Sequence, residues 1–318
     1  MPAGFSPPPG PAEAGAETER SQGSVATALL RGVGVPALVG VVGPGQQVAS
    51  VTAALEGTAP GQLAVRPLAD DAAARESVLH HDVYGALVLG GPAPRLLTAG
   101  ANGQGVTMTL TQAFTPLARQ GGQQLQVQDL RPLSPGDTRG LGIFYGAFGV
   151  VLGGFLFGIT SYQAAPKLPL RWRLLSILLF AVTSGALVGW AADVLYAAVP
   201  AGFGIVAGLV ALLALAVAPA ALVLRAIGSA GTFVTSLALV ILGNAASTGN
   251  LPAQYLPPWL EPLAEFLPPG VAVRALRGAT YFADDGVARA VWVLGLWSVV
   301  PLLLIGLLDA VSRRRGHA

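Results

Sequence analysis

The chain has 318 residues, of which 53% are hydrophobic and only 11% are charged, and its mean hydropathy is +0.63. These values exclude an ordinary water-soluble protein and are typical of a chain about half of which faces lipid. The absence of cysteine excludes disulfides, thiol catalysis and thiolate metal sites. The net charge of +2 is small and the basic residues mostly flank apolar stretches, so we expect no nucleic-acid partner.

The region before the apolar stretches predicts a tail and a small α/β domain. Residues 1–24 are rich in Pro, Gly and Ser and are predicted to be a disordered tail. Residues 25–139 predict the element order β-α-β-α-β-β-α-β. The strands are expected in PALVGVVG, LAVRPL, VYGALVLG, PRLLTAG and LQVQDLRPL, and the helices in GQQVASVTAALEG, DDAAARESVLHH and GVTMTLTQAFTPLARQG.

The titratable residues of this domain favour structural roles over chemistry. His80 and His81 are adjacent, so they cannot share one helix face or easily bind one metal, and we expect an exposed helix end. Asp70 and Asp71 resemble a carboxylate pair, but a helix N-cap is the better interpretation. The sequence contains neither GKS/GKT nor GxGxxG, which predicts no ATPase of its own. We therefore expect no enzyme, no cofactor, and no catalytic or metal site.

Five long apolar stretches fill the C-terminal half, and none contains Lys, Arg, Asp or Glu. They cover residues 140–161, 174–192, 202–224, 227–246 and 290–308. A helix of about 20 such residues crosses a hydrocarbon core roughly 30 Å thick. Residues 140–310 therefore predict a transmembrane domain, a membrane α-helical bundle of five helices, followed by a basic tail at residues 311–318.

The basic residues beside the apolar stretches predict the orientation. Seven fall on one side of the membrane, namely Lys167, Arg171, Arg173, Arg225, Arg313, Arg314 and Arg315, and Arg274, Arg277 and Arg289 fall on the other. Because cytoplasmic loops carry the excess of Lys and Arg, we expect an extracytoplasmic α/β domain and a cytoplasmic C-terminus. The preference for Arg over Lys, with abundant Ala, Gly and Pro, is associated with GC-rich bacterial genomes. We expect the chain in a bacterial inner (plasma) membrane, which it crosses several times.

This orientation raises the question of how the domain crosses the membrane, since an outer domain normally follows a signal peptide or a leading span. The best candidate, residues 24–43, has Arg31 near its middle. A central Arg costs about 2.5–3.5 kcal/mol on insertion scales, so we expect no span there. Three explanations stay open: a lost N-terminal span, a misplaced start, or a domain that stays inside the cell.

Inside the apolar stretches, small residues recur at a spacing of four. The pairs are Gly142/Gly146, Gly149/Gly153, Gly154/Gly158, Gly185/Gly189 and Gly204/Gly208. Such pairs allow close helix packing, here favoured inside the bundle, with a homodimer face as the alternative. The polar residues Asp193, Arg225, Asn244 and Asp309 lie at stretch ends, where interfacial solvation is expected and an ion pathway is not.

Residues 250–282 are unusual because two proline pairs bracket an amphipathic stretch. Trp259, Phe266 and intervening leucines have helical spacing, and Glu261 and Glu265 lie four apart on the polar face. This predicts a short helix lying in the outer interface, anchored by Trp259. A second short helix carrying Arg274 and Arg277 is expected to approach the membrane again.

The sequence LPPG…RALRGATYF, followed by a last apolar helix and basic residues, resembles the end of type-2 ABC transporter permeases. An α/β domain ending in RPLSPGDTRGLGIFYGAFGVVLGGFLFG, followed by five helices, is similar to their phage infection protein branch, over residues 36–315. The resemblance implies six spans with an extracytoplasmic domain between the first two, and the first span is missing here. It implies no functional residues that can be placed on this chain.

Two functions follow as expectations. The first is a permease-like membrane subunit of an export system for hydrophobic or envelope-related substrates, energised by a separate ATPase. The second is a non-transporting envelope protein whose outer domain is a receptor or assembly scaffold. A membrane enzyme ranks third, because no nucleophile–base set or metal cluster is visible. The expected partners are the lipid bilayer, the ATPase and a second copy of the chain.

Overall fold

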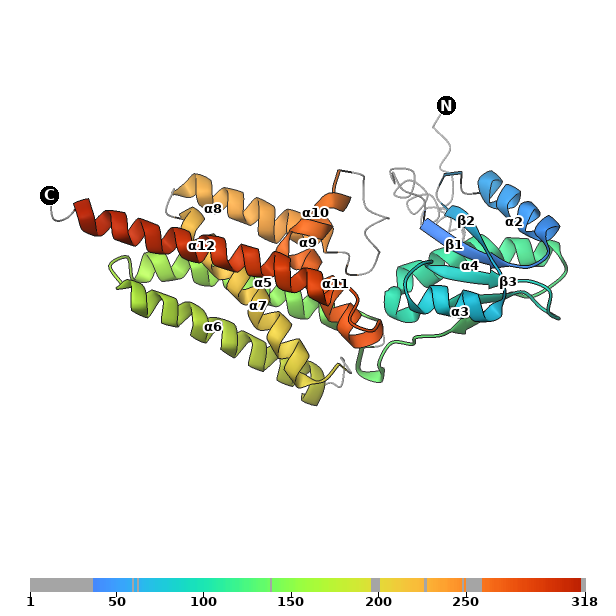
Figure 1. The fold of residues 1–318 in the computed structure, drawn as a ribbon, viewed down its shortest axis with the longest axis horizontal. Helices are drawn as coiled ribbons and strands as arrows, with labels where there is room; N and C mark the ends of the chain where they lie inside the picture. The colour runs from blue at the N-terminus through green and yellow to red at the C-terminus, as the bar shows by residue number, and fades with distance from the viewer. Residues whose placement is uncertain are drawn as a thin grey trace, which may run out of the picture.

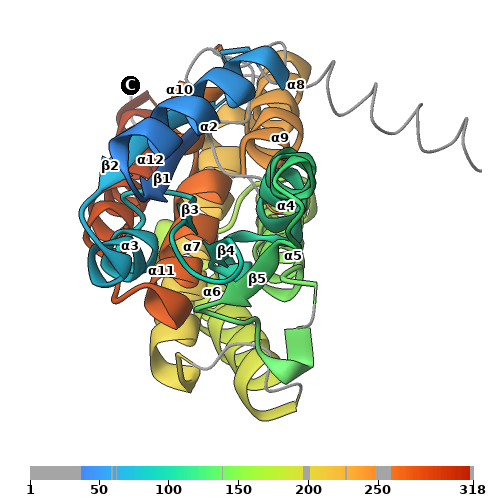
Figure 2. The ribbon, with the colours of Figure 1, turned by 90° about the vertical axis from the view of Figure 1, so that its right-hand side faces the viewer.

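The protein is described by a computed structural model covering residues 37–58, 60–61, 63–137, 139–195, 201–225, 228–247, 249 and 259–315. An α/β domain and a helical bundle follow one another along the long axis (Figure 1). The view along that axis shows the domain lying over one end of the bundle (Figure 2). The predicted tail and the candidate span up to residue 36 lie outside the described residues.

The predicted element order of the α/β domain is confirmed. The elements are β1 (Ala37–Val42), α2 (Gly45–Thr58), β2 (Leu63–Leu68), α3 (Asp71–Leu79), β3 (Gly85–Val88), β4 (Arg95–Thr98), a 3-10 turn (Gly100–Asn102), α4 (Gln104–Gln120) and β5 (Gln126–Asp129). The sheet order is β2-β1-β3-β4-β5. Strand β1 is parallel to β2 and β3, β4 is antiparallel to β3, and β5 is parallel to β4.

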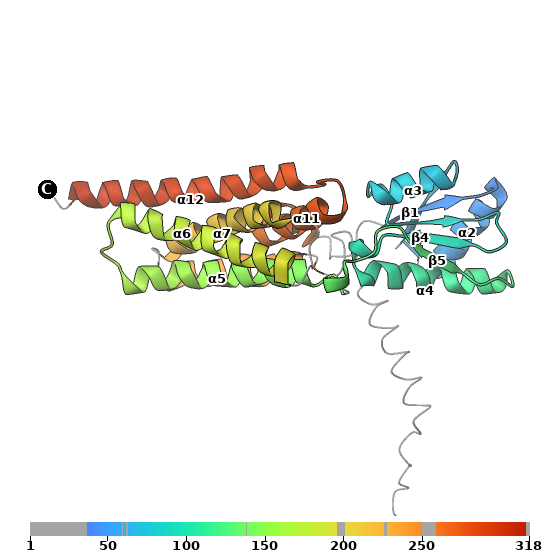
Figure 3. The same ribbon diagram turned by 90° about the horizontal axis from the view of Figure 1, so that it is seen from below.

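The two faces of the sheet have separate cores, because successive strand residues point to opposite sides. Leu87 and Leu96 pack with α2 and α4 on one face. Helix α4 contributes the buried Phe114 to this core. Their neighbours Ala86 and Leu97 pack with α3 on the other face. Figure 3 shows α3 and α4 on opposite sides of the strands.

The five predicted apolar stretches are confirmed as helices long and apolar enough to cross a membrane, over Gly142–Ala164, Leu170–Val194, Phe203–Val223, Ser229–Ala246 and Val287–Val311. As elements they are α5 (Gly142–Ala164), α6 (Leu170–Trp190) with a π-helical segment (Ala191–Leu195), α7 (Phe203–Arg225), a composite of α8 (Ser229–Thr235), a π-helical segment (Ser236–Leu242) and α9 (Gly243–Ala246), and α12 (Val287–Arg315). Two short helices, α10 (Glu261–Phe266) and α11 (Pro268–Tyr281), precede α12.

The chain path gives the bundle two distinct ends. Helices α5, α7 and α12 run away from the α/β domain, whereas α6 and the α8–α9 composite run back toward it (Figures 1 and 3). We call the two ends the domain end and the far end. The end of α12 lies at the far end, so the α/β domain and the end of α12 are on opposite sides of the bundle. Helix α7 is central: 67% of its apolar window is buried, against 22–33% in the other four.

Close helix contacts explain part of the glycine pattern. A Cβ on Gly158 of α5 would lie 2.6 Å from Cβ of Ala221 on α7, and a Cβ on Gly185 of α6 would collide with the backbone oxygen of Ala207 on α7. These positions pack inside the bundle, as predicted. A Cβ added to Gly149 or to Gly208 would meet no atom within 4 Å, so these two glycines make no such close helix contact.

Candidate functional site: the junction between domain and bundle

The junction starts with a hairpin of two short helices, α10 and α11. Pro268 and Pro269 occupy the first turn of α11, where proline is favoured, and Leu267 before them has the extended backbone that a following proline requires. A Cβ on Gly270 would collide with the carbonyl oxygen of Ala264, so only glycine lets the two helices approach this closely. The chain therefore turns back sharply between α10 and α11.

The hairpin is packed against the bundle. Nine of the fourteen residues of α11 are buried, and this helix contacts α12, α7, α5 and α9. Leu260, just before the short helix α10, and Ala264 within it are buried against Ala246 of α9, and Trp259 is exposed. The two predicted short helices are present as α10 and α11, and their buried residues contact protein. Residues 250–258 lie outside the described part.

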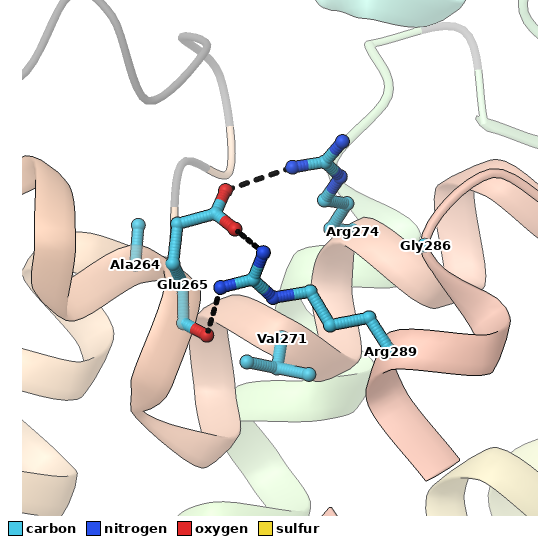
Figure 4. Close-up of a pocket in the computed structure, with 6 residues that line it drawn as sticks. All are labelled: Ala264, Glu265, Val271, Arg274, Gly286 and Arg289. Atoms are coloured by element: carbon cyan, nitrogen blue, oxygen red, sulfur yellow. Dashed lines mark hydrogen bonds and ion pairs between the residues drawn. The ribbon is translucent and has the colours of Figure 1, made fainter. Parts of the chain in front are cut away.

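Glu265 connects three helices through charge (Figure 4). Its Oε1 lies 2.8 Å from Nη1 of Arg274 on α11, and its Oε2 lies 2.8 Å from Nη1 of Arg289 on α12. Arg289 also donates from Nη2 to the Glu265 backbone carbonyl at 3.3 Å. A small hollow of about 10 Å³ beside them, with room for about one water molecule, is also lined by Val271 and Gly286. Glu265 therefore lies on a polar face, and its two ion pairs hold α10, α11 and α12 together.

The turn between α11 and α12 has an unusual backbone. Ala283 and Asp284 have φ of 47° and 67°, and His81 of the α/β domain has φ of 63°. Among the described residues these three are the only ones other than glycine with positive φ. Such conformations are uncommon for residues with a Cβ and cluster where the surrounding structure holds them in place. A Cβ on Gly278 would collide with the carbonyl oxygen of Asp285, so the turn also needs this glycine.

Phe282 in this turn is a core residue of the α/β domain. Its side chain is 4% exposed and packs with Val78, Leu97 and other residues on the α3 face of the sheet. Its ring centroid lies 3.7 Å from that of His81. The domain therefore completes one of its two cores with a side chain from a segment about 200 residues away. A movement of α11 relative to α12 would act directly on this core.

Further polar contacts join the two parts of the molecule. Tyr281 Oη accepts a hydrogen bond from the Ser134 backbone N–H at 3.2 Å. Asp137 accepts from the N–H groups of Leu141 and Gly142 at 2.9 and 2.7 Å, which satisfies the start of α5. Arg277 donates to the Gly249 carbonyl at 2.8 Å. Burial lowers the pKa of the Arg277 guanidinium, and the nearby Asp137 carboxylate opposes that shift.

His81 is the titratable member of the ring contact with Phe282. Burial lowers the pKa of its imidazole, and the carboxylate of Asp285, with Oδ2 3.3 Å from Nδ1, acts in the opposite direction. Asp285 is also within 3.4 Å of Arg274. The prediction that both histidines mark an exposed helix end holds for His80 alone, because His81 is partly buried at the junction. No local pattern could reveal this, since the contacting residues are about 200 positions away.

The other residues singled out in the sequence lie apart from the junction. Asp70 accepts from the Ala73 N–H at 2.8 Å and is the predicted N-cap of α3. Asp71 pairs with Arg75 and Arg95 at 2.7 and 2.8 Å, and the hydrogen bond from Arg75 contributes most to lowering the pKa of its carboxyl group. Within the described ranges, no group of three or more His, Asp or Glu side chains is arranged to hold a metal ion.

The polar residues of the apolar helices lie at helix ends. Asp193 is in the π-helical segment that ends α6, Asn244 is in α9, and Asp309 is near the end of α12. Arg225 is the last residue of α7, and its side chain lies outside the described part. These positions agree with the predicted placement at the ends of the spans.

The fold defines a helical bundle able to span a membrane five times, with an α/β domain attached at one end. No family model, no curated protein and no solved structure matches the chain.

Proposed function

We propose that this chain is a permease-like, multi-pass subunit of a bacterial inner-membrane export system, with the α/β domain outside and the end of α12 in the cytoplasm. In this proposal it moves hydrophobic or envelope-related molecules and is energised by a separate ATPase. The resemblance of LPPG…RALRGATYF to type-2 permeases suggests this class, and the five apolar helices supply the membrane domain.

The observation that carries the proposal is the junction. Helix α11 packs on α5, α7 and α12, and the turn after it places Phe282 in the core of the α/β domain. Rearrangement of the bundle would therefore change the position or the packing of the domain, as a transporter that coordinates an outer domain with its membrane helices requires. The alternative, an envelope receptor or scaffold, needs the domain at the surface but needs no such coupling.

The orientation can be tested first, because the chain has no cysteine and single cysteines report cleanly. Gln46→Cys, on the exposed start of α2, and Lys167→Cys, in the α5–α6 loop, would be probed in intact cells with a membrane-impermeant maleimide. We expect labelling at position 46 alone. Labelling at 167 alone would reverse the orientation, and labelling at both without cell lysis would show that α5 does not cross the membrane.

The export activity is tested by comparing cells with the native chain, cells without it, and cells with Phe282→Ala. Retention of fluorescent amphiphiles and the lipid composition of the outer envelope would be measured, and a C-terminal affinity tag would recover an associated ATPase. We expect export in native cells, loss in both others, and co-purification of an ATPase. Altered phage sensitivity or surface composition with unchanged export would instead establish the receptor or scaffold function.

A further inference from the structure

A groove lies between α5 and the α8 composite, remote from the junction. It has a volume of about 420 Å³, within the range of ligand sites in proteins. Helix α5 contributes Phe155, Ile159 and Gln163, and the other wall is formed by residues of α8 and its π-helical segment, which include Thr232 and Phe233. Gln163 is one residue before the end of α5, so the groove begins at the far end of the bundle.

The α5 wall of the groove changes from polar to apolar along the bundle axis, whereas the other wall keeps a hydroxyl at Ser236, seven residues beyond Ser229. Gln163 and Ser229 lie at the mouth, one at the end of α5 and the other at the start of α8. Phe155 is eight residues before Gln163, which places it about 12 Å deeper along the helix. Phe233 is one turn beyond Ser229, so both rings lie deeper than the amide and the hydroxyl. The order on the α5 wall matches an amphiphile with its head at the membrane interface and its chain toward the bilayer centre.

The seven residues that line the groove carry no charge, so their direct contacts with a head group would be hydrogen bonds. Gln163, Ser229, Thr232 and Ser236 offer hydroxyl and amide groups that both donate and accept hydrogen bonds. Thr232 Oγ1 donates to the Gly228 carbonyl at 3.3 Å, and its lone pairs remain acceptors. Polar groups beside hydrocarbon are costly unless they are hydrogen-bonded. A head group that itself donates and accepts would satisfy them.

We propose that this groove binds a membrane lipid with an uncharged, hydroxyl-bearing head group, such as a glycosyl diacylglycerol, between Gln163 and Ser229, with an acyl chain along Phe155 and Phe233. This inference rests on the membrane residence in the proposed function and deepens it by naming a lipid class. Recognition depends on hydrogen bonds at the mouth and on chain packing in the deeper part.

The test uses the full chain in detergent and a glycosyl diacylglycerol that carries a diazirine in one acyl chain. After irradiation, labelled peptides are mapped by mass spectrometry. We expect labelling of residues 155–163 and 229–236 above that of the exposed face of α6 around Leu179. Unlabelled glycosyl diacylglycerol should compete roughly three- to tenfold better than phosphatidylcholine, whose head lacks hydroxyl donors, as one net hydrogen bond predicts. Equal labelling of α6 and the groove would overturn the proposal.

Two variants and one control sharpen the test. Ser236→Trp should fill the groove and remove the labelling, whereas Leu179→Trp on the 57% exposed face of α6 should leave it unchanged. Gln163→Leu should keep chain labelling but abolish the preference over phosphatidylcholine. If Ser236→Trp does not fold, the Gln163→Leu competition still decides, and an unchanged preference there contradicts the proposal. Specific binding without any export would refute the proposed function alone.

Discussion

The two parts of the molecule bury side chains of different size. The α/β domain buries large side chains such as Leu96, Leu110 and Phe114, which are at most 1% exposed. The bundle buries alanines at its centre and leaves Trp292 and Leu303 81% and 68% exposed. In water the first arrangement is stabilised by apolar burial, whereas helices in lipid gain most from close contact between small residues. Phe282 is a large buried side chain like those of the domain, although it belongs to a turn of the bundle.

The largest expected effect comes from Phe282, which lies in a turn of the bundle and packs in the core of the α/β domain. Phe282→Ala should destabilise the α3 face of the domain by about 3–5 kcal/mol, as is typical of a buried phenylalanine. Hydrogen exchange of β3 and β4 in the full chain would measure this. Phe266→Ala, on an exposed ring of the same hairpin, is the matched control and should change β3 and β4 little. Equal exchange in both variants would show that the domain core does not depend on the junction.

The importance of close contacts between small residues in the bundle is tested with two glycines of α5. Gly158→Leu should lower the stability of the bundle by about 1–3 kcal/mol, because the side chain would enter the backbone of α7. Gly149→Leu, also on α5, has open space and is the control. Thermal unfolding in detergent compares the two. Helix propensity favours Leu over Gly at both positions, so a similar loss in both would contradict a special role for the close α5–α7 contact.

The sequence was sufficient for every pattern that is local. The order of strands and helices from Ala37 to Asp129 followed from runs of apolar residues, and the five apolar helices followed from length and composition. The N-cap role of Asp70 is also local, since its partner is three residues away. Each of these features depends on residues within one element or one turn, where periodicity and capping rules apply.

The junction could not be predicted because its contacts join distant segments. His81 and Phe282 belong to runs that read separately as a helix end and as the approach to an apolar helix. The spacing of Glu265 indicates a polar face but not its partners, because Arg274 and Arg289 lie on other helices. Only the fold brings them together. The sequence LRGATYFADDG did contain a signal, since adjacent aromatics before a turn with two aspartates suit a buried anchor followed by backbone with positive φ.

A smaller effect is expected at the ion pairs of the hairpin. Glu265→Gln keeps the shape of the side chain but removes both charge pairs, and at this degree of exposure we expect a loss of about 0.5–1 kcal/mol. The loss should shrink as salt is raised, because exposed charges are screened. Glu76→Gln on exposed α3 is the control. Exchange of α10 and α11 amides at two salt concentrations measures the difference, and an effect independent of salt would contradict an electrostatic origin.

The smallest expected effect is a dependence of the junction on pH. The pKa of folded His81 lies below its ordinary value of 6.5 because of burial, and the charged groups facing it are Asp285 and Arg274, with the Asn102 amide beside them. When the junction opens and His81 is exposed to solvent, its imidazole has the ordinary, higher pKa. The open state therefore takes up a proton first as the pH falls. Junction stability is fully present above about pH 6.5, declines from there to the folded pKa, and stays constant below it.

Two histidine variants measure this pH effect. Exchange of the amides in residues 282–286 should become faster in the native chain as the pH falls from about 7.5 to 5, after correction for the intrinsic rate. His81→Asn keeps a residue that tolerates positive φ and removes the titrating ring, so the dependence should disappear. His80→Asn, one residue away and exposed, should retain it. Retention of the pH dependence in His81→Asn would show that a group other than His81 is responsible.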